Sequence, residues 1–316
     1  MKRPVTLVTG FLGSGKTTLV AELLRRPELS ETAVIVNELG EVGLDHHLLR
    51  RVDERTVLLA SGCVCCTLRG DLTDELRDLL DRSDAGEIPY FRRVVVETTG
   101  VADPTPIVNT LLTDPFVPHH YSLDGVVATI DGQHGLRGME SLKQAAAADV
   151  LVMTKPDLSD ETSLDSLERE LLSLNPTAPV LRVVYGDVDP ELLLRAGGRP
   201  WPEVAVVTDT AHDHADGLRA VVLELDWVLD WTAFGIWLTM LLHARGSDLY
   251  RVKGLLDVGG DGPLLVNGVQ HAVHPPVHLD AWPNEERRSR LVFIGRRVDA
   301  DELATSLRVF DRAARR

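Results

Sequence analysis

Short apolar runs alternate with amphipathic segments along the first two-thirds of the chain. Runs of four to six mostly apolar residues predict buried β-strands, and the segments between them place apolar residues at helical spacing. Unbroken apolar strands that alternate with helices indicate an α/β fold, in which a mostly parallel sheet has helices on both faces. The predicted strands are Val5–Thr9, Ala33–Asn37, Val57–Ala60, Arg93–Glu97, Gly125–Ile130, Val150–Met153 and Val180–Val184. The predicted helices cover about 16–26, 71–82, 139–148 and 161–174.

The pattern changes between Tyr185 and Gly217, where Gly, Pro, Asp and His dominate. Such a composition predicts a boundary between domains. We therefore expect one domain over residues 1–200, a linker over 201–217 and a smaller domain over 218–316. Strands follow one another with short turns in the last part, which predicts an α+β domain with an antiparallel sheet. Its predicted strands are 219–227, 249–258, 264–273 and 291–295, and its predicted helices are 232–244 and 300–312.

The balance of charges narrows the choice of partners. The chain has 316 residues, with 33 basic and 48 acidic side chains and a formal net charge of −15. Nucleic acid and anionic membranes are therefore unfavourable general partners, because their phosphates would be repelled. The sequence contains no run of 18 apolar residues, so it predicts no transmembrane helix. Pro4, Gly10 and Lys16 interrupt the apolar stretch near the N-terminus, which favours a buried strand over a signal peptide.

A glycine-rich segment lies between the first predicted strand and the first predicted helix. Residues 10–18 read GFLGSGKTT and match the Walker A pattern of P-loop nucleotide-binding proteins. Glycines let consecutive backbone N–H groups converge on one anion, and the helix N-terminus adds a positive dipole end. We expect Lys16 to neutralise phosphate oxygens and the Thr17 hydroxyl to bind Mg²⁺. The expected nucleotide-binding residues of the loop are Gly10, Gly13, Ser14, Gly15, Lys16, Thr17 and Thr18.

Acidic residues end two of the predicted strands. Glu97 stands where a Walker B element usually has an Asp on Mg²⁺, and Gly100 would let the backbone approach the γ-phosphate. Glu38 and Glu41 follow the second strand, where a switch region would lie, and are candidates to orient water or to bind metal. For each of these acids the alternative is a solvated loop side chain. The candidate catalytic residues are Lys16, Glu38 and Glu97.

Residues 154–157 follow a buried strand and read TKPD. Guanine-binding proteins use Asn-Lys-x-Asp at such a place, where the Asp accepts hydrogen bonds from guanine and the Lys stem stacks on the ring. Here Thr154 replaces the Asn, while Lys155 and Asp157 retain the groups that would contact the guanine ring. The segment therefore favours GTP over ATP and adds Lys155 and Asp157 to the expected nucleotide site.

All three cysteines of the chain lie within four positions, as Cys63, Cys65 and Cys66. Cysteines this close cannot form a disulfide framework, so a reducing cytoplasm and a thiolate metal site are the better interpretation. Thiolates are soft ligands that suit Zn²⁺ and Cu(I). Three of them leave a tetrahedral site incomplete, and water, Glu38, Glu41 or a ligand from a partner could complete it. Buried apolar thiols and a redox sensor are the alternatives.

Taken together, the motifs resemble those of the CobW-type P-loop GTPases. The resemblance rests on GFLGSGKTT at 10–18, VNELGEVGLD at 36–45, GCVCCT at 62–67, VETTGVADP at 96–104 and TKPD at 154–157. It continues in the last part of the chain with YRVKGLLDV at 250–258, LLVNGVQ at 264–270 and RLVFIGRR at 290–297. The chain departs from the family at Thr154 and Pro156. It also has only His212 and His214 where many relatives have a longer His-rich loop.

This resemblance implies a GTPase that binds zinc, or cobalt, and delivers it to a client metalloprotein. By motif position, Lys16 and Thr17 would hold phosphate and Mg²⁺, Glu97 would belong to Walker B, and Asp157 would read guanine. Cys63, Cys65 and Cys66 would hold the transferred metal. We further expect nucleotide state to set metal affinity, and the second domain to recognise the client. The alternatives are a general P-loop ATPase or kinase with a structural thiolate zinc site, and a redox-regulated binding protein. The oligomeric state is not indicated.

Overall fold

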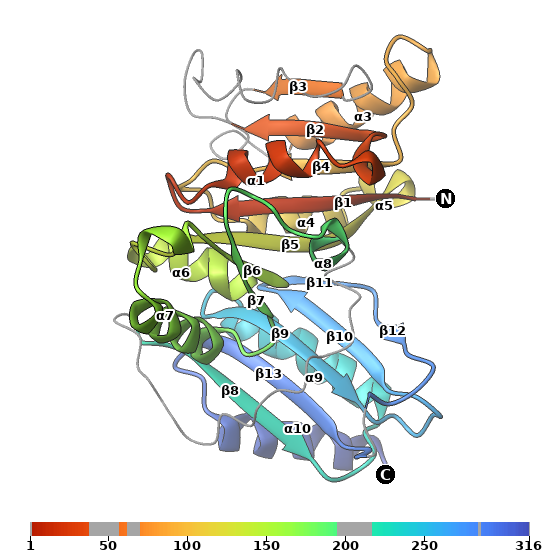
Figure 1. The fold of residues 1–316 in the computed structure, drawn as a ribbon. Helices are drawn as coiled ribbons and strands as arrows, with labels where there is room; N and C mark the ends of the chain where they lie inside the picture. The colour runs from red at the N-terminus through yellow and green to blue at the C-terminus, as the bar shows by residue number, and fades with distance from the viewer. Residues whose placement is uncertain (1, 38–56, 62–69, 195–216, 284–285, 316) are drawn as a thin grey trace. The chain divides into compact units, whose positions relative to one another are not determined.

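The structure is a computed structural model that describes residues 2–37, 57–61, 70–194, 217–283 and 286–315. It divides into two compact units, each built on its own sheet (Figure 1). The first unit comprises Met1–Leu171 and Ala178–Arg199, and the second comprises Leu172–Thr177 and Pro200–Arg316.

The described part of the first unit holds a seven-stranded sheet in the order β3-β2-β4-β1-β5-β6-β7. Every neighbouring pair of strands is parallel. The predicted α/β fold with a parallel sheet is therefore confirmed. The strands are β1 (Arg3–Gly10), β2 (Thr32–Asn37), β3 (Val57–Ser61), β4 (Arg93–Glu97), β5 (Tyr121–Asp131), β6 (Val150–Thr154) and β7 (Val180–Val183).

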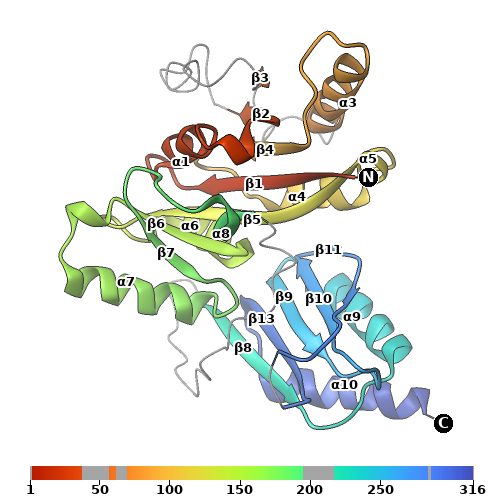
Figure 2. The ribbon, with the colours of Figure 1, turned by 45° about the vertical axis from the view of Figure 1, so that its right-hand side comes forward.

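Helices connect these strands and cover both faces of the sheet, as Figure 2 shows from a second direction. On one face α1 and α8 pack against the central strands, with Leu19 and Leu193 in one cluster with Val8 and Val152. On the other face α4 and α6 contact β5. The helices are α1 (Lys16–Leu23), η1 (Pro27–Leu29), α3 (Gly70–Asp84), α4 (Thr105–Thr113), α5 (Val117–His120), α6 (Gly138–Ala147), η2 (Pro156–Leu158), α7 (Glu161–Leu174) and α8 (Pro190–Leu193).

Helices α4 and α5 were not predicted, because each begins beside a proline that marks a turn in sequence. In the structure the prolines occupy first turns, where a missing N–H costs nothing. The Asp103 carboxylate accepts from the Thr105 N–H at 2.9 Å before α4, and Asp114 accepts from the Phe116 N–H at 2.8 Å before α5. An aspartate carboxylate thus holds the turn that leads into each helix.

The second unit contains an antiparallel sheet in the order β11-β10-β9-β13-β8, with β12 paired to β10. The predicted smaller α+β domain with an antiparallel sheet is confirmed. Its strands are β8 (Leu218–Leu225), β9 (Leu249–Leu256), β10 (Leu264–Val269), β11 (Ala272–Val273), β12 (Val277–His278) and β13 (Ser289–Arg296). Its helices are α9 (Trp231–Arg245) and α10 (Ala300–Ala314).

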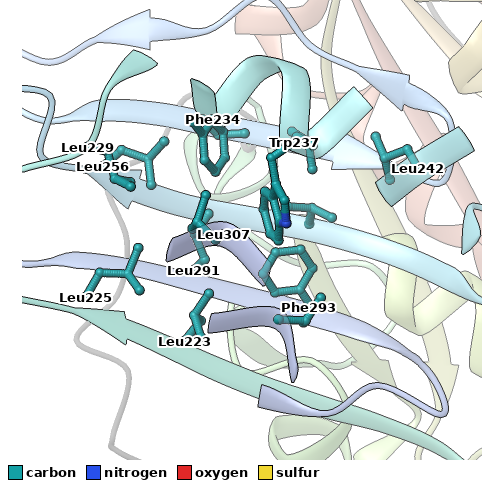
Figure 3. Close-up of a cluster of buried hydrophobic side chains, with 14 of the residues drawn as sticks. Leu223, Leu225, Leu229, Phe234, Trp237, Leu242, Leu256, Leu291, Phe293 and Leu307 are labelled. Carbon is teal, nitrogen blue, oxygen red and sulfur yellow. The ribbon is translucent and has the colours of Figure 1, made fainter. Parts of the chain in front are cut away.

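Both helices of this unit contribute to one core with the sheet, shown in Figure 3. Trp237 of α9 packs edge-on against Phe293 of β13, with ring centroids 6.0 Å apart. The Trp237 indole N–H also donates to Ser306 of α10 at 2.9 Å, so the buried ring has a partner for its polar atom. Leu307 of α10 is completely buried in the same cluster.

One predicted strand is wrong. Residues 264–273 form a hairpin, because Gln270 has a positive φ of 49° and reverses the chain. Val269 then pairs with Ala272 across the turn. The apolar run continued through the turn, so hydrophobicity alone could not locate it. Among the described residues, none of the helices combines the length and hydropathy needed to cross a membrane.

Candidate functional site

The loop between β1 and α1 depends on glycines at both of its ends. Gly15 precedes the first residue of α1 with a left-handed φ of 88°, and no side chain caps the N–H groups of that helix end. Gly10 has φ 145°, and a Cβ there would lie 2.2 Å from Thr129 Oγ1. Glycine is therefore required at Gly15 because of the backbone conformation and at Gly10 because a side chain has no space. Exposed Gly13 lies between them, also at a positive φ.

Lys16, the first residue of α1, turns its side chain back under this loop. It is only 8 % exposed, and its ammonium group donates to the carbonyl oxygens of Gly10 at 2.8 Å and Phe11 at 3.1 Å. A buried ammonium beside uncapped helix N–H groups makes this loop a site for an anion. Thr18, two residues further along the same helix, is exposed.

The end of β4 meets the start of α1 through one short contact. Thr17 Oγ1 donates to Glu97 Oε1 at 2.6 Å, and Glu97 is only 3 % exposed. Parallel pairing of β1 with β4 sets Val8 opposite Glu97, so the sheet itself brings the carboxylate to the loop. A hydroxyl and a carboxylate oxygen this close form a pair of hard oxygen donors, which suits Mg²⁺.

Gly100 lies directly against the phosphate-loop backbone. A Cβ added at Gly100 would be 2.6 Å from the Leu12 amide nitrogen and 2.7 Å from its Cα. The buried side chain of Gln144 on α6 donates to the carbonyls of Gly100 at 3.3 Å and Ala102 at 3.0 Å, which fixes the segment after β4. Sequence reasoning did not find Gln144, because a single amide on a helix matches no motif.

The segment after β6 is tied to the same loop. Thr154 Oγ1 lies within hydrogen-bond distance of the Ser14 carbonyl at 2.8 Å and the Ile130 carbonyl at 3.2 Å. Ser14 Oγ is also 2.6 Å from Thr129 Oγ1 of β5. The hydroxyl that replaces the expected Asn thus joins β5, β6 and the phosphate loop.

Lys155 and Asp157 follow on the next residues. Lys155 has a left-handed φ of 52°, and its ammonium group donates to the Gly13 carbonyl at 2.7 Å. Asp157 lies in η2 with its side chain exposed. An exposed carboxylate beside a lysine stem that reaches the phosphate loop is compatible with recognition of a purine edge.

Asp131, at the end of β5, completes this arrangement and was not predicted. Its Oδ2 accepts from Lys155 at 2.7 Å, and its Oδ1 accepts from the N–H groups of Gln133 at 2.9 Å and His134 at 3.1 Å. Burial would raise the pKa of Asp131, but the hydrogen bonds from Lys155, His134 and Gln133 hold it below its ordinary value. The available signal was its place one residue after the predicted strand 125–130, at the carboxyl edge of the sheet.

The structure therefore brings together the phosphate loop, Glu97, Gly100 and Lys155, with Asp157 exposed two residues further on. The remaining predicted site residues lie outside the described residues; they are Glu38, Glu41, Cys63, Cys65, Cys66, His212 and His214. Within the described part of the chain, no cluster of three or more His, Cys, Asp or Glu side chains could hold a metal ion.

A parallel sheet whose first strand leads through a glycine-rich anion loop into a helix defines a P-loop nucleotide-binding protein. Residues 4–182 match the family model described as "CobW/HypB/UreG, nucleotide-binding domain". Residues 218–310 match "Cobalamin synthesis protein cobW C-terminal domain". The chain belongs to the CobW family, as its motifs suggested.

Relatives match over nearly the whole length. The zinc chaperone YjiA of Escherichia coli is 36 % identical over 308 residues, which cover 95 % of this chain and 96 % of the relative. A zinc chaperone CobW of a Sinorhizobium species is 28 % identical, and the match covers 96 % of this chain and 95 % of the relative. The crystal structure of Zn(II)-bound YjiA GTPase superimposes with a TM-score of 0.74 at 33 % identity, over 98 % of this chain and 99 % of that one.

Proposed function

We propose that this protein is a GTP-hydrolysing metallochaperone, which binds zinc through Cys63, Cys65 and Cys66 and transfers it to a client metalloprotein. The observation that carries the proposal is the 2.6 Å contact between Thr17 and Glu97, since it joins the phosphate loop to the Walker B strand. The similarity over nearly the full length to proteins named zinc chaperones supports the metal cargo. Cobalt is the alternative cargo.

The proposed nucleotide site uses the loop from Gly10 to Thr18. Its backbone N–H groups and Lys16 would bind the phosphates, and Gly100 would let the backbone approach the γ-phosphate. Thr17 and Glu97 would hold Mg²⁺, which supplies charge neutralisation on the β- and γ-phosphate oxygens when bound. Glu38 and Glu97 are the proposed carboxylates for hydrolysis, with Lys16 stabilising the charge that develops.

Guanine is the proposed base. The Asp157 carboxylate would accept from the ring N–H and the exocyclic amino group, which adenine does not present in that pattern. The Lys155 stem would stack on the ring. Thr154, which replaces the Asn of the guanine motif, holds this segment against the phosphate loop through the Ser14 and Ile130 carbonyls.

The sheet topology supports coupling between nucleotide and metal. Strand β3 ends at Ser61 opposite Asn37 of β2, and Val36 of β2 lies opposite Glu97 of β4. Strand β3 therefore ends two strands away from Glu97, at the edge of the sheet where the phosphate loop also lies. Neighbouring strands are about 4.8 Å apart, so this separation is on the order of 10 Å. We propose that GTP and zinc each change the affinity for the other.

The proposal also assigns the remaining parts of the chain. Residues 1–200 form the GTPase domain, 201–217 the linker and 218–316 the domain that recognises the client. Clustered reduced thiols favour the cytoplasm as the compartment.

The decisive experiment measures GTP turnover with and without one equivalent of Zn²⁺, in the wild type and in a Cys63/Cys65/Cys66→Ser variant. We expect zinc to change GTP affinity or turnover in the wild type and to have no effect in the variant. ATP, assayed in parallel, should be used less well. GTP turnover that does not change with zinc, or equal turnover of ATP, would instead favour a general P-loop ATPase with a structural thiolate site.

A further inference from the structure

Asp131 lies where three chain segments meet at the carboxyl edge of the first sheet. It ends β5 directly opposite Thr154, the last residue of β6. The next residue, Gly132, donates its N–H to the Thr154 carbonyl at 2.7 Å, and a Cβ on Gly132 would be 2.8 Å from that oxygen. The ends of β5 and β6 are therefore in close contact, with no room for adjustment between them.

The two oxygens of the Asp131 carboxylate have separate partners. Oδ1 accepts the backbone N–H groups of Gln133 and His134, and the His134 ring nitrogen is 3.2 Å away. Oδ2 accepts from the Lys155 ammonium group at 2.7 Å. One oxygen therefore shapes the turn after β5, and the other oxygen binds a side chain that follows β6.

Lys155 needs such support. Its backbone lies in the left-handed region, at φ 52°, which costs on the order of 1 kcal/mol for a residue with a side chain. Its side chain is long and partly exposed, so holding it in one rotamer also costs conformational entropy. The Gly13 carbonyl and the Asp131 carboxylate hold its ammonium group from two directions. A charge-assisted bond to the largely buried Asp131 side chain is the stronger of these restraints.

We propose that Asp131 is a positioning residue for the nucleobase, which acts by holding Lys155 across the phosphate loop. The inference rests on the proposed function, since it deepens the account of the same nucleotide site. Through Lys155 the carboxylate sets where the lysine stem presents its apolar side to the base. It also fixes the loop that carries Asp157 two residues later. Asp131 itself does not touch the nucleotide.

The separate partners of the two oxygens allow a clean variant. Asp131→Asn keeps an oxygen that can accept the turn N–H groups, as Asn does in the same kind of turn. It replaces the other oxygen with an N–H donor that faces the Lys155 ammonium group, so the ion pair is lost. Lys155→Met removes the ammonium group and keeps the unbranched apolar stem.

The test is a double-mutant cycle on the full-length protein, with affinities for GDP, ADP and pyrophosphate measured by calorimetry in the presence of Mg²⁺. A bond between charged groups is typically equivalent to about tenfold in affinity or more. We therefore expect Asp131→Asn to weaken GDP binding about tenfold. Pyrophosphate, which has no base, should bind within about twofold of the wild type. The double variant should bind GDP no more weakly than Lys155→Met alone, because the two residues act as one unit.

Asp165→Asn is the matched control. Asp165 is an exposed carboxylate on α7 that pairs with Arg182 at 2.5 Å, and Arg182 keeps two further carboxylates, Glu161 and Glu168. The control removes the same charge from the same unit and should leave GDP affinity unchanged. Thermal melting of each variant checks that the fold persists.

Three outcomes would overturn the inference: GDP affinity unchanged in Asp131→Asn, effects of the two substitutions that multiply in the double variant, or equal weakening of pyrophosphate. The failure of the proposed function has a different signature. If the wild type binds ADP as tightly as GDP, guanine recognition is wrong, and the cycle measured with ADP still decides whether Asp131 acts through Lys155.

Discussion

Thr17 Oγ1 lies 2.6 Å from Glu97 Oε1, although 80 residues separate the two in sequence. The pairing of β1 with β4 produces this contact, because it sets the end of one strand beside the loop that leaves the other. In the proposed function these two oxygens hold Mg²⁺, and an alanine at either position would remove one of them.

Substitution of Thr17 should therefore uncouple nucleotide binding from Mg²⁺. We expect Thr17→Ala to weaken GTP binding in Mg²⁺ about 10–100-fold, the usual cost of removing groups that support a metal. In EDTA the wild type and the variant should bind alike. Thr17→Ser keeps the hydroxyl and should keep the Mg²⁺ dependence. Fluorescence titration with a labelled GTP analogue at several Mg²⁺ concentrations measures this. Equal Mg²⁺ dependence in Thr17→Ala would contradict the assignment.

Replacing the Asp157 carboxylate should change which base is bound. Guanine presents N–H donors to a carboxylate, whereas xanthine presents a carbonyl that the amide of an Asn can donate to. Asp157→Asn should lower GDP affinity about a hundredfold or more and raise that of xanthosine diphosphate. Asp160→Asn is the control, since Asp160 is three residues away and an Asn there still accepts from the Ser163 N–H. Competition calorimetry with both nucleotides compares the variants, and an unchanged GDP preference in Asp157→Asn would rule out its assigned role.

A methyl group at Gly100 should disturb the phosphate loop. The added Cβ would lie 2.6 Å from the Leu12 amide nitrogen, so the backbone of one segment must move. Displacements of about 1 Å in such sites can cost on the order of a hundredfold in activity. We expect Gly100→Ala to reduce GTP turnover by tenfold to about a hundredfold in a steady-state phosphate-release assay. In contrast, Gly235→Ala meets no atom within 4 Å inside α9 and should raise stability by about 1 kcal/mol with normal turnover. Normal turnover in Gly100→Ala would mean that this segment does not shape the site.

Tyr121 predicts how stability falls in alkali. The side chain is completely buried, its hydroxyl donates to the Leu76 carbonyl at 2.7 Å, and burial raises the pKa of Tyr121 to about 12 from 10.0. Between these two values the unfolded chain loses the proton and the folded protein keeps it. The stability associated with the neutral hydroxyl is therefore fully present below pH 10 and is lost as pH rises toward 12, by roughly 2–3 kcal/mol.

The matched variant for this effect is Tyr121→Phe. It lacks the titrating group, so its stability should decline less steeply between pH 10 and pH 12. At pH 7 it should be about 1 kcal/mol less stable, because one buried hydrogen bond is missing. Urea denaturation at each pH gives both quantities. Parallel pH profiles for the two proteins would show that the Tyr121 pKa is not raised in the folded state.

The sequence was most informative where one residue type serves one physical purpose. Gly15 and Lys16 identify an anion loop because glycine adopts the left-handed turn freely and the lysine supplies the positive charge that a bound anion needs. Val-rich runs identified the parallel strands for a similar reason, since both sheet faces exclude water. At such positions the residue type favoured by the local backbone is also the one that the fold requires.

The sequence was less informative where a residue acts through a distant partner. In the sequence Asp131 is indistinguishable from other acidic residues that follow a strand. Only the pairing of β5 with β6 shows that it binds Lys155. Gln144 likewise holds two carbonyls more than 40 positions away. Helix α4 was missed for a local reason, since its prolines indicated a turn at the place where the helix begins. Long-range hydrogen bonds leave no periodic signal, so pattern reasoning cannot find them.

The hydrogen bonds of Ser14 to Thr129 and Thr154 have a thermodynamic consequence for this unit. They hold the phosphate loop in shape through the interior strands β5 and β6, so the loop is preorganised and a ligand need not bear the entropy cost of ordering it. The same contacts then contribute to ligand affinity and to the free energy of unfolding, because a ligand that binds only the folded state is linked to its stability. A cavity opened deep in β5 or β6, far from any phosphate, should thus be detectable as faster nucleotide release.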